Sequence, residues 1–419
     1  MNWNRPLFSP RVLRLHAENA AFLARLVELS RDGPMTRMVD LYDMEARLDG
    51  HLDALVLAGQ AGAEAAGEVL AAAQGWGEVF TAAHVLLRHR AEVELADLLP
   101  EGVLVAENAG AIAAGAAACP PERIAARMRR WIGAADPLQA AVALGVCLRR
   151  GTDARDHLLP LTRHRDEGVA ALALRLAGET GRSDLLAAAQ ARIGAEDAPG
   201  FEAARAATLL GDRGAGPRTL AAAAALLPPR QAREAAELFP LVLPEGEVRR
   251  AIGALHERPA SRRWAVVAAG AFGRSDSFDW LLRQMAEPSL ARAAGLALCQ
   301  ITGIRLGAEN LELATFPEDP PDPVVEADPL ESFIEGQAYW PDPEKLAPWL
   351  EARRGRFAAG ERHLAGAAAW THQPPAEDRD RTQLVQRALA LEFACRSPEA
   401  PLPNWRAPVR PTDRGFTRT

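Results

Sequence analysis

The chain has 419 residues, of which 48% are hydrophobic and 25% are charged, and this composition is typical of a folded protein. Its formal net charge is -7, which argues against nucleic acid as a partner, because phosphate backbones attract basic surfaces. Lys345 is the sole lysine and follows Asp342-Pro343-Glu344, so it cannot serve a phosphate-binding loop, which needs a lysine directly after a glycine run.

Two helices are predicted in residues 1–60. The first covers residues 11–30, where apolar side chains recur at three- and four-residue steps: Leu15, Phe22, Leu26 and Leu29. A stripe with this spacing is typical of the face that an amphipathic helix buries. After a break at Gly33-Pro34, a second helix follows, so this part of the chain is expected to be an N-terminal helical hairpin.

Residues 61–305 repeat with a period of about 30 residues. Equivalent core helices are predicted to open near eight positions: Gly77, Glu107, Pro137, Glu167, Gly200, Arg230, Ser261 and Ser289. Two short helices cannot bury an apolar face alone, so each unit must stack on its neighbours. Alanine, about a fifth of the chain, lets such helices approach closely. The period favours a HEAT-like α-solenoid over tetratricopeptide or ankyrin repeats, whose signature residues are absent.

One turn is preserved between two of the repeats. It reads Gly-Arg-Ser-Asp at residues 181–184 and again at residues 273–276, which is three periods further on. In each copy we expect a helix to end at the glycine, because glycine adopts the left-handed backbone conformation there. We expect the serine or aspartate to cap the helix that follows.

After residue 305 the composition changes. Residues 306–342 form an acidic connector rich in proline, which breaks helices. Residues 343–419 carry two predicted helices, Glu344–Arg354 and Arg381–Arg396, and several tryptophans, which indicates a C-terminal helical cap packed on the end of the repeats. The sequence therefore predicts an all-α fold in four parts: the hairpin 1–60, the solenoid 61–305, the connector 306–342 and the cap 343–419.

The residues that most often carry chemistry show no catalytic pattern. No pair of histidines has the spacing of metal ligands on one helical turn, and the four cysteines have no Cys-x-x-Cys spacing. We therefore expect no catalytic residue, no metal and no cofactor, and we expect the cysteines to be small buried hydrophobic residues in a reducing cytoplasm. No run of 18 apolar residues and no secretory signal occurs, so no membrane partner is expected.

Two charged clusters are candidate contacts of a protein partner. The acidic cluster comprises Glu318, Asp319, Asp322, Glu326, Asp328 and Glu331. It is either a solvated loop or a negative arm that attracts a basic partner over a long range. The basic cluster comprises Arg354, Arg356 and Arg362. These arginines either hold an acidic group of the partner or belong to an ion-paired surface.

Several motifs resemble a proteobacterial family of HEAT-like repeat proteins whose members lie near type VI secretion genes. The motifs are HAENAAFL (16–23), LYDMEARLDGHLDAL (41–55), ALCQITG (297–303), WPDP (340–343), RF (356–357) and RHLAG (362–366). The resemblance extends from about residue 11 to residue 410. It implies a cytoplasmic partner of that secretion system.

The function that this resemblance implies is that of an immunity protein, which binds a secreted toxic effector and neutralises it without catalysis. An adaptor or chaperone that loads an effector onto the secretion apparatus is the alternative. A third, weaker interpretation is an enzyme of the lyase type, because some short HEAT-repeat proteins attach chromophores. A cluster of cysteine, histidine or aspartate on one surface would favour the enzyme.

Overall fold

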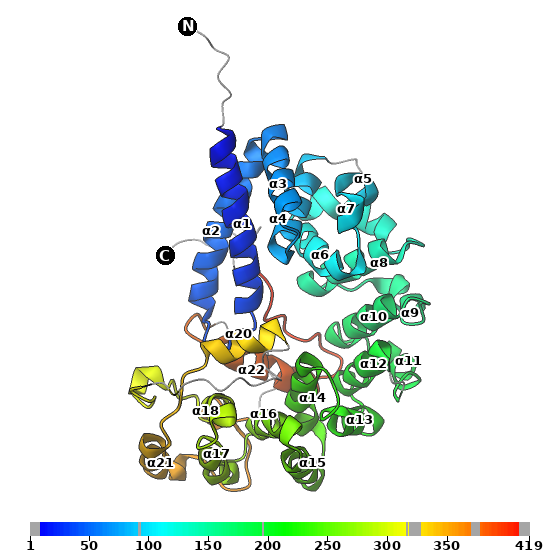
Figure 1. Ribbon diagram of the computed structural model, residues 1–419. Helices are drawn as coiled ribbons and strands as arrows, with labels where there is room; N and C mark the ends of the chain where they lie inside the picture. Colours follow the sequence, from blue (N-terminus) through cyan, green and yellow to red (C-terminus); the bar gives the residue numbers. More distant parts are fainter. Residues whose placement is uncertain are drawn as a thin grey trace. The chain divides into compact units, whose positions relative to one another are not determined.

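The computed structural model describes residues 9–90, 94–194, 197–315, 317, 328–369 and 378–409 (Figure 1). These residues are mostly helical, so the prediction of an all-α fold is confirmed. No helix among them is long and apolar enough to cross a membrane.

The chain divides into two compact units, and neither is continuous in the sequence. Unit 1 comprises Met1–Arg31, Met38–Leu176 and Arg406–Thr419, and unit 2 comprises Asp32–Arg37 and Ala177–Trp405. The boundary at Leu176 falls inside the repeat region, so the repeats are shared between the two units.

Unit 1 is a set of helices joined by short turns (Figure 1). Its elements are α1 (Pro10–Ser30), α2 (Met38–Leu57), α3 (Gln60–Ala72), α4 (Trp76–His89), α5 (Leu95–Leu98), the 3-10 turns η1 (Glu101–Val103) and η2 (Ala106–Asn108), α6 (Ala109–Ala117), α7 (Pro121–Trp131), α8 (Pro137–Arg150), η3 (Arg155–His157), α9 (Leu158–Leu161) and most of α10 (Glu167–Glu179). Helices α1, α4, α6 and α8 form a row in which each helix packs along the next. Helices α2 and α3 each contact both α1 and α4.

Small residues set the spacing of this row. A Cβ atom added to Gly77 of α4 would lie 2.0 Å from the backbone oxygen of Ala21 in α1. One added to Gly145 of α8 would lie 2.7 Å from the Cβ atom of Ala113 in α6. The helices therefore approach so closely that only glycine fits at these positions, in agreement with the role expected for small side chains.

Helix α1 does not bury the stripe that the sequence predicts. Its buried face is formed mainly by alanines: Ala17, Ala20, Ala21 and Ala24 are all at most 3% exposed. Leu15 and Phe22, which the prediction places in the core, are 50% and 66% exposed. That part of the prediction is wrong, because the alanine face lets the backbone of α1 pack more closely on its neighbours than the face with large side chains would.

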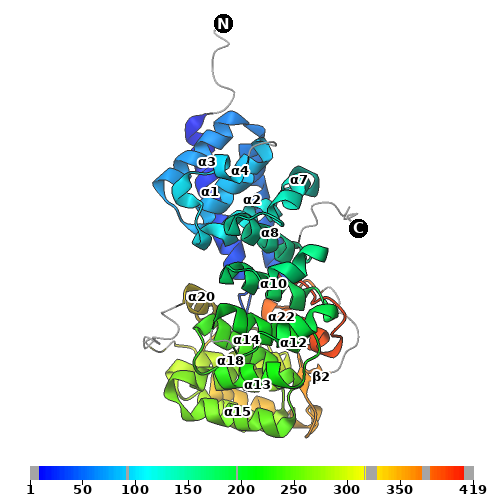
Figure 2. The same cartoon turned by 90° about the vertical axis from the view of Figure 1, so that its right-hand side faces the viewer.

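Unit 2 contains a second row of helices, α12, α14, α16 and α18, in which each helix again packs on the next. All four are labelled in Figure 1, and Figure 2 shows α12, α14 and α18 after a 90° turn. The elements of its first part are η4 (Ser183–Leu185), α11 (Leu186–Gln190), α12 (Ala198–Leu209), α13 (Ala215–Ala223), α14 (Pro229–Val242), α15 (Glu245–Glu257), η5 (Pro259–Ser261), α16 (Arg262–Phe272), η6 (Ser275–Ser277), α17 (Phe278–Gln284), α18 (Pro288–Thr302) and η7 (Gly307–Glu309). Helices α13, α15 and α17 pack on the outside of this row.

The predicted openings of the repeats coincide with the starts of row helices. Helices α4, α6, α8, α10, α12, α14, α16 and α18 each begin within two residues of a predicted position. Gly181 and Gly273 have φ angles of 68° and 71°, as expected for glycine at a helix end. The expected serine and aspartate caps are absent from the turns and helices that follow. Asp276 instead forms an ion pair with Arg249 of α15.

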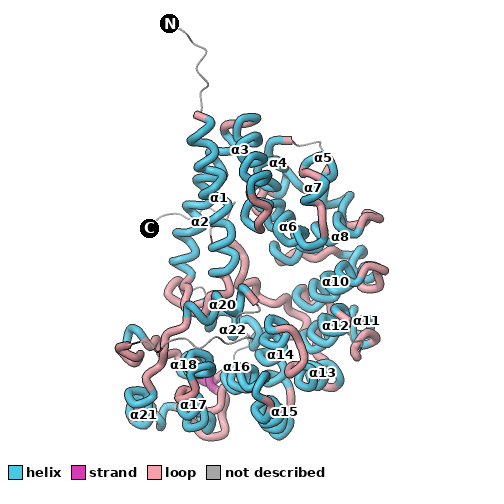
Figure 3. The backbone as a smooth tube through the Cα atoms, viewed as in Figure 1, coloured by secondary structure: helices cyan, strands magenta, loops and turns pink. Residues whose placement is uncertain are grey.

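The C-terminal elements of unit 2 pack along its row, whereas the sequence places them at its end. They are α20 (Pro329–Gln337), α21 (Pro343–Glu351), η8 (Arg354–Arg356), the antiparallel strands β1 (His363–Leu364) and β2 (Ala367–Ala368), and α22 (Gln383–Arg396) (Figure 3). Helix α22 contacts α12, α14 and α18, and α20 contacts α14. Apolar packing explains this position, because Ala390, Leu391 and Ala394 of α22 belong to the same hydrophobic core as residues of α12, α14 and α16.

Candidate functional site

The acidic candidate residues are described only in part. Four of them lie outside the described residues: Glu318, Asp319, Asp322 and Glu326. Asp328 caps α20, because its carboxylate accepts hydrogen bonds from the backbone N–H groups of Leu330 and Glu331 at 2.8 and 3.2 Å. Glu331 is fully buried and pairs with Arg233 of α14. Both described carboxylates are thus used within the chain, to start α20 and to hold it on the row.

Two of the three basic candidates lie on an exposed turn after α21. Arg354 pairs with Asp279 of α17 and with Glu351 of α21, each at 2.9 Å. Ion pairs in such exposed positions contribute about 0–1 kcal/mol to stability. Arg356 is also exposed. For Arg354, the placement supports the ion-paired surface that the sequence left open as an alternative.

The third basic candidate, Arg362, fastens α22 to α16. Its guanidinium donates to the carboxylate of Glu392 in α22 at 2.8 and 3.2 Å. It also donates to the backbone oxygen of Phe272 in α16 at 3.0 Å. Glu392 is 2% exposed and accepts a further hydrogen bond from Arg396. The donors of Arg362 are therefore engaged inside unit 2.

An arginine ladder, which the sequence analysis missed, runs along the row of unit 2. It consists of Arg233 of α14, Arg263 of α16 and Arg292 of α18, which are about one repeat apart in the sequence and all buried. Arg233 donates to both oxygens of Glu331 at 2.6 and 2.5 Å. Arg263 and Arg292 share the carboxylate of Glu335, one turn further along α20. The ladder thus meets two carboxylates on one face of α20.

The ladder places three guanidinium groups along the row of unit 2, and the two carboxylates of α20 pair with them. Burial disfavours the charge on Arg233, yet the contact with Glu331 outweighs burial and raises the pKa of Arg233 above its ordinary value. The sequence does carry a signal for the ladder, because each of three successive repeats has an arginine near its start.

An open groove of about 420 Å³ lies between α13 and α15. Both helices are labelled in Figure 2. Alanines of the two helices line it: Ala221, Ala222, Ala225, Ala251 and Ala254. These side chains are too short to fill the space between the helices. Three arginines also line the groove: Arg218, Arg250 and Arg258. Leu226, just beyond the end of α13, is 81% exposed.

The charge around this groove is mostly not neutralised. Arg218 pairs across it with Glu247, with N–O distances of 2.8 and 2.9 Å, and this contact lowers the pKa of Glu247. Arg250 and Arg258 are exposed, and neither forms an ion pair with a carboxylate of the described residues. Arg250 also lowers the pKa of Glu247, which is the one carboxylate among the residues that line the groove. The groove therefore combines an apolar floor with an excess of positive charge.

Two smaller cavities, of about 20 and 30 Å³, lie between the row of unit 2 and α22. Each has room for about one water molecule, which is far less than a substrate needs. Glu237, Gln300 and Arg387 line both of them. Burial raises the pKa of Glu237, and the nearby Arg387 and Arg233 compensate only in part. These cavities are polar parts of the interior.

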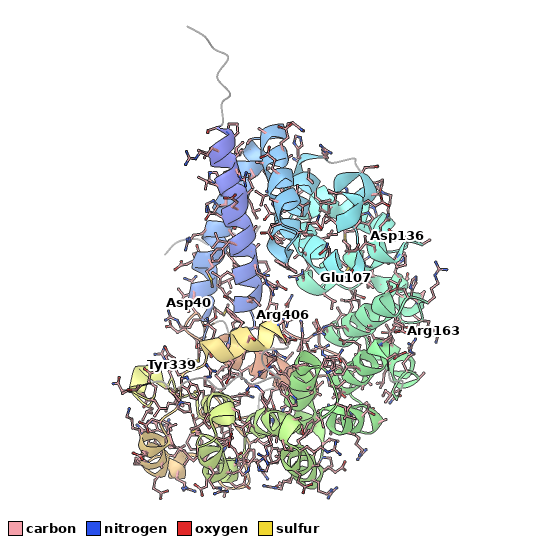
Figure 4. All side chains as sticks on the ribbon, viewed as in Figure 1. Asp40, Glu107, Asp136, Arg163, Tyr339 and Arg406 are labelled. Carbon is pink, nitrogen blue, oxygen red and sulfur yellow. The ribbon has the colours of Figure 1, made fainter. Side chains whose placement is uncertain are left out.

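A second cluster of buried charge ties α1 to α8 in unit 1. Arg149 of α8 donates to both oxygens of Glu28 in α1 at 2.9 and 2.8 Å. Burial alone would raise the pKa of Glu28, but Arg149, Arg31 and Arg406 together lower it to about 2 (Arg406 is labelled in Figure 4). Glu28 is therefore a structural anion of unit 1.

The cysteines and histidines form no metal site in the described part of the chain. No group of three or more histidine, cysteine, aspartate or glutamate residues there could hold a metal ion. All four cysteines are free and buried, as the sequence predicts. Burial raises the pKa of Cys119, Cys299 and Cys395 to about 12, so these thiols stay protonated and unreactive at neutral pH.

His84 is expected to make the stability of unit 1 depend on pH. It is 3% exposed, and burial lowers its pKa to about 4. As the pH falls below about 6.5, the unfolded chain takes up a proton that the folded chain does not, so stability is lost down to about pH 4. At pH 5 this loss is about 2 kcal/mol. Urea unfolding at pH 7.5 and pH 5 should show a smaller difference for His84→Gln than for the natural chain, and equal differences would contradict the prediction.

The chain matches no family model, and neither a curated protein nor a solved structure matches it. The sequence reasoning also missed the groove, although the alanine run at residues 221–225 marks one wall of it. Inference about function therefore depends on the surfaces described above.

Proposed function

We propose that the chain is a HEAT-like α-solenoid that binds another protein and performs no catalysis. The two rows of helices, whose starts recur about every 30 residues, support the solenoid. The observation that carries the binding function is the groove between α13 and α15, which is open, apolar at its floor and positively charged at its rim.

The chemistry of the groove defines the part of a partner that fits it. The alanine floor offers a shallow apolar surface to a ridge of aliphatic side chains. Arg250 and Arg258 offer donors for carboxylates that flank such a ridge. An exposed acidic segment with aliphatic side chains therefore fits best. Because exposed charges also attract a partner over a long range, the arginines should speed association as well as strengthen it.

For the identity of the partner we draw on the resemblance between the terminal motifs and the family near type VI secretion genes. We propose a cytoplasmic immunity protein whose partner is a toxic effector of that system. Neutralisation then requires only that the bound chain covers the working surface of the toxin. The same surface would serve an adaptor that loads an effector, so the two roles differ in their phenotype and not in their chemistry.

Charge reversal in the groove is the direct test of the binding surface. Arg250→Glu combined with Arg258→Glu should weaken binding of the effector encoded beside the chain by at least tenfold, because two attractive contacts become repulsive. The measurement is titration calorimetry with the purified pair, together with survival of cells that co-express the toxin. The matched control is Arg283→Glu with Arg305→Glu, which reverses two other exposed arginines of unit 2. Equal affinity of the groove variant, the control and the natural chain would exclude the groove.

Deletion of the gene distinguishes an immunity protein from an adaptor. Loss of an immunity protein should make cells sensitive to toxin delivered by their kin, whereas loss of an adaptor should only stop secretion of the effector. If the chain forms no complex with the effector and gives no protection, the proposed function is wrong.

A further inference from the structure

Helix α1 carries an apolar stripe that no other described residue buries. Val12, Leu15 and Phe22 are 49%, 50% and 66% exposed, and Asn19 completes the stripe. In Figure 1 no helix lies in front of α1. We call these four residues the α1 seam.

The seam has the spacing of a coiled-coil interface. Its residues follow one another at steps of three, four and three, which places Val12 and Asn19 at a positions and Leu15 and Phe22 at d positions of a heptad. At about 100° per residue, the seam lies roughly 150° around the helix from the alanine face that unit 1 buries. A helix that is apolar on two opposite sides is typical of one packed on both sides. Unit 1 provides the packing on one side only.

We propose that the α1 seam pairs with the α1 seam of a second copy of the chain, as a short parallel two-stranded coiled coil. An asparagine at an a position favours a coiled coil of two helices, because the amides of the two copies hydrogen bond to each other across the interface. Val12, Leu15 and Phe22 then each face the same residue of the second copy. The buried alanine face points away from the interface, so unit 1 keeps its own packing.

The side chains of α1 favour the parallel direction over the antiparallel one. In an antiparallel pair Leu15 faces Asn19, so each amide is buried with no partner beyond the backbone oxygen of Leu15 in its own helix, to which it donates at 2.7 Å, and this is costly. The flanking positions would then bring Arg11 opposite Arg25 and Glu18 opposite Glu18, and like charges repel. A parallel pair avoids all of these contacts.

The seam is about two heptads long, which is short for a stable interface. We expect a dimer that dissociates in the micromolar range, on the order of tens of micromolar, as small interfaces do. The proposal is independent of the proposed function, because the seam lies in unit 1 and the groove lies in unit 2. Either proposal can fail without the other.

Sedimentation of the full chain at concentrations from about 5 to 500 μM, which bracket that affinity, tests the pairing. The natural chain should shift from monomer to dimer with concentration, and Phe22→Glu should weaken the dimer at least tenfold. The control is Leu226→Glu, which changes an apolar residue of unit 2 that is even more exposed than Phe22 and should leave the dimer intact. A chain that is monomeric throughout, or a dimer that Phe22→Glu does not weaken, overturns the proposal.

Disulfide cross-linking tests the direction. In the parallel pair the two copies of Leu15 face each other, so Leu15→Cys should give a covalent dimer under mild oxidation. The four natural cysteines are buried and do not compete. Leu226→Cys, the control, should not cross-link. A concentration-dependent dimer in which Leu15→Cys fails to cross-link would overturn the parallel arrangement.

Discussion

Replacement of Glu331 by alanine is expected to destabilise unit 2 by about 3–5 kcal/mol, because its buried partner is left with only the more distant carboxylate of Glu237, at 4.0 Å. That partner is Arg233, which is 7% exposed and gives two hydrogen bonds to Glu331. Urea unfolding followed by circular dichroism measures the loss. Hydrogen exchange in α20 should rise at the same time, since Glu331 holds this helix on α14.

A matched pair of substitutions shows whether burial is the cause. Glu351→Ala removes a carboxylate from an exposed ion pair with Arg354 and should cost at most about 1 kcal/mol. The double variant Arg233→Met with Glu331→Leu removes both charges and should recover most of the lost stability. If Glu331→Ala and Glu351→Ala had equal effects, the ladder would not be a structural element.

Gly77→Ala is expected to destabilise unit 1 by about 3 kcal/mol, although alanine is the better helix former. The new methyl group would lie 2.0 Å from the backbone oxygen of Ala21, so α1 and α4 must move apart. That oxygen belongs to a helix backbone and cannot turn away as a flexible side chain could. The midpoint of urea unfolding, measured by circular dichroism, should fall.

Gly67→Ala is the control, and it should change the stability of unit 1 in the opposite direction. Gly67 lies within α3, and a Cβ atom added there has no neighbour within 4 Å. The substitution should therefore stabilise the helix by about 0.5–1 kcal/mol through propensity alone. If both substitutions stabilised unit 1, close contact between the row helices would not limit the choice of residue at position 77.

The row helices could be predicted because their signal is local and periodic. A repeat of about 30 residues, turn glycines such as Gly181 and Gly273, and the abundance of alanine all follow from packing between neighbours in the chain. The same reasoning placed the helices that became α21 and α22. It could not place them in space, because their contacts with the row join residues far apart in the sequence.

The candidate residues were harder to predict, because charge alone does not reveal burial. Asp328 and Glu331 belong to one acidic segment, yet the first caps α20 and the second enters the interior. The role of Glu331 depends on the ladder, whose arginines lie about 40 to 100 residues earlier in the chain. The exposed seam on α1 was hidden for a related reason. Helical spacing identifies an apolar stripe, and it does not identify what the stripe contacts.

The contact between α20 and the ladder restricts how this chain can change in length. Repeat proteins commonly gain and lose whole repeats, because each one contacts only its neighbours. A nine-residue helix is about 13 Å long, and packed helices lie about 8–10 Å apart. An extra repeat between α14 and α18 would carry Arg233 and Arg292 too far apart for Glu331 and Glu335 to reach both. We therefore expect the number of repeats in this stretch to be fixed.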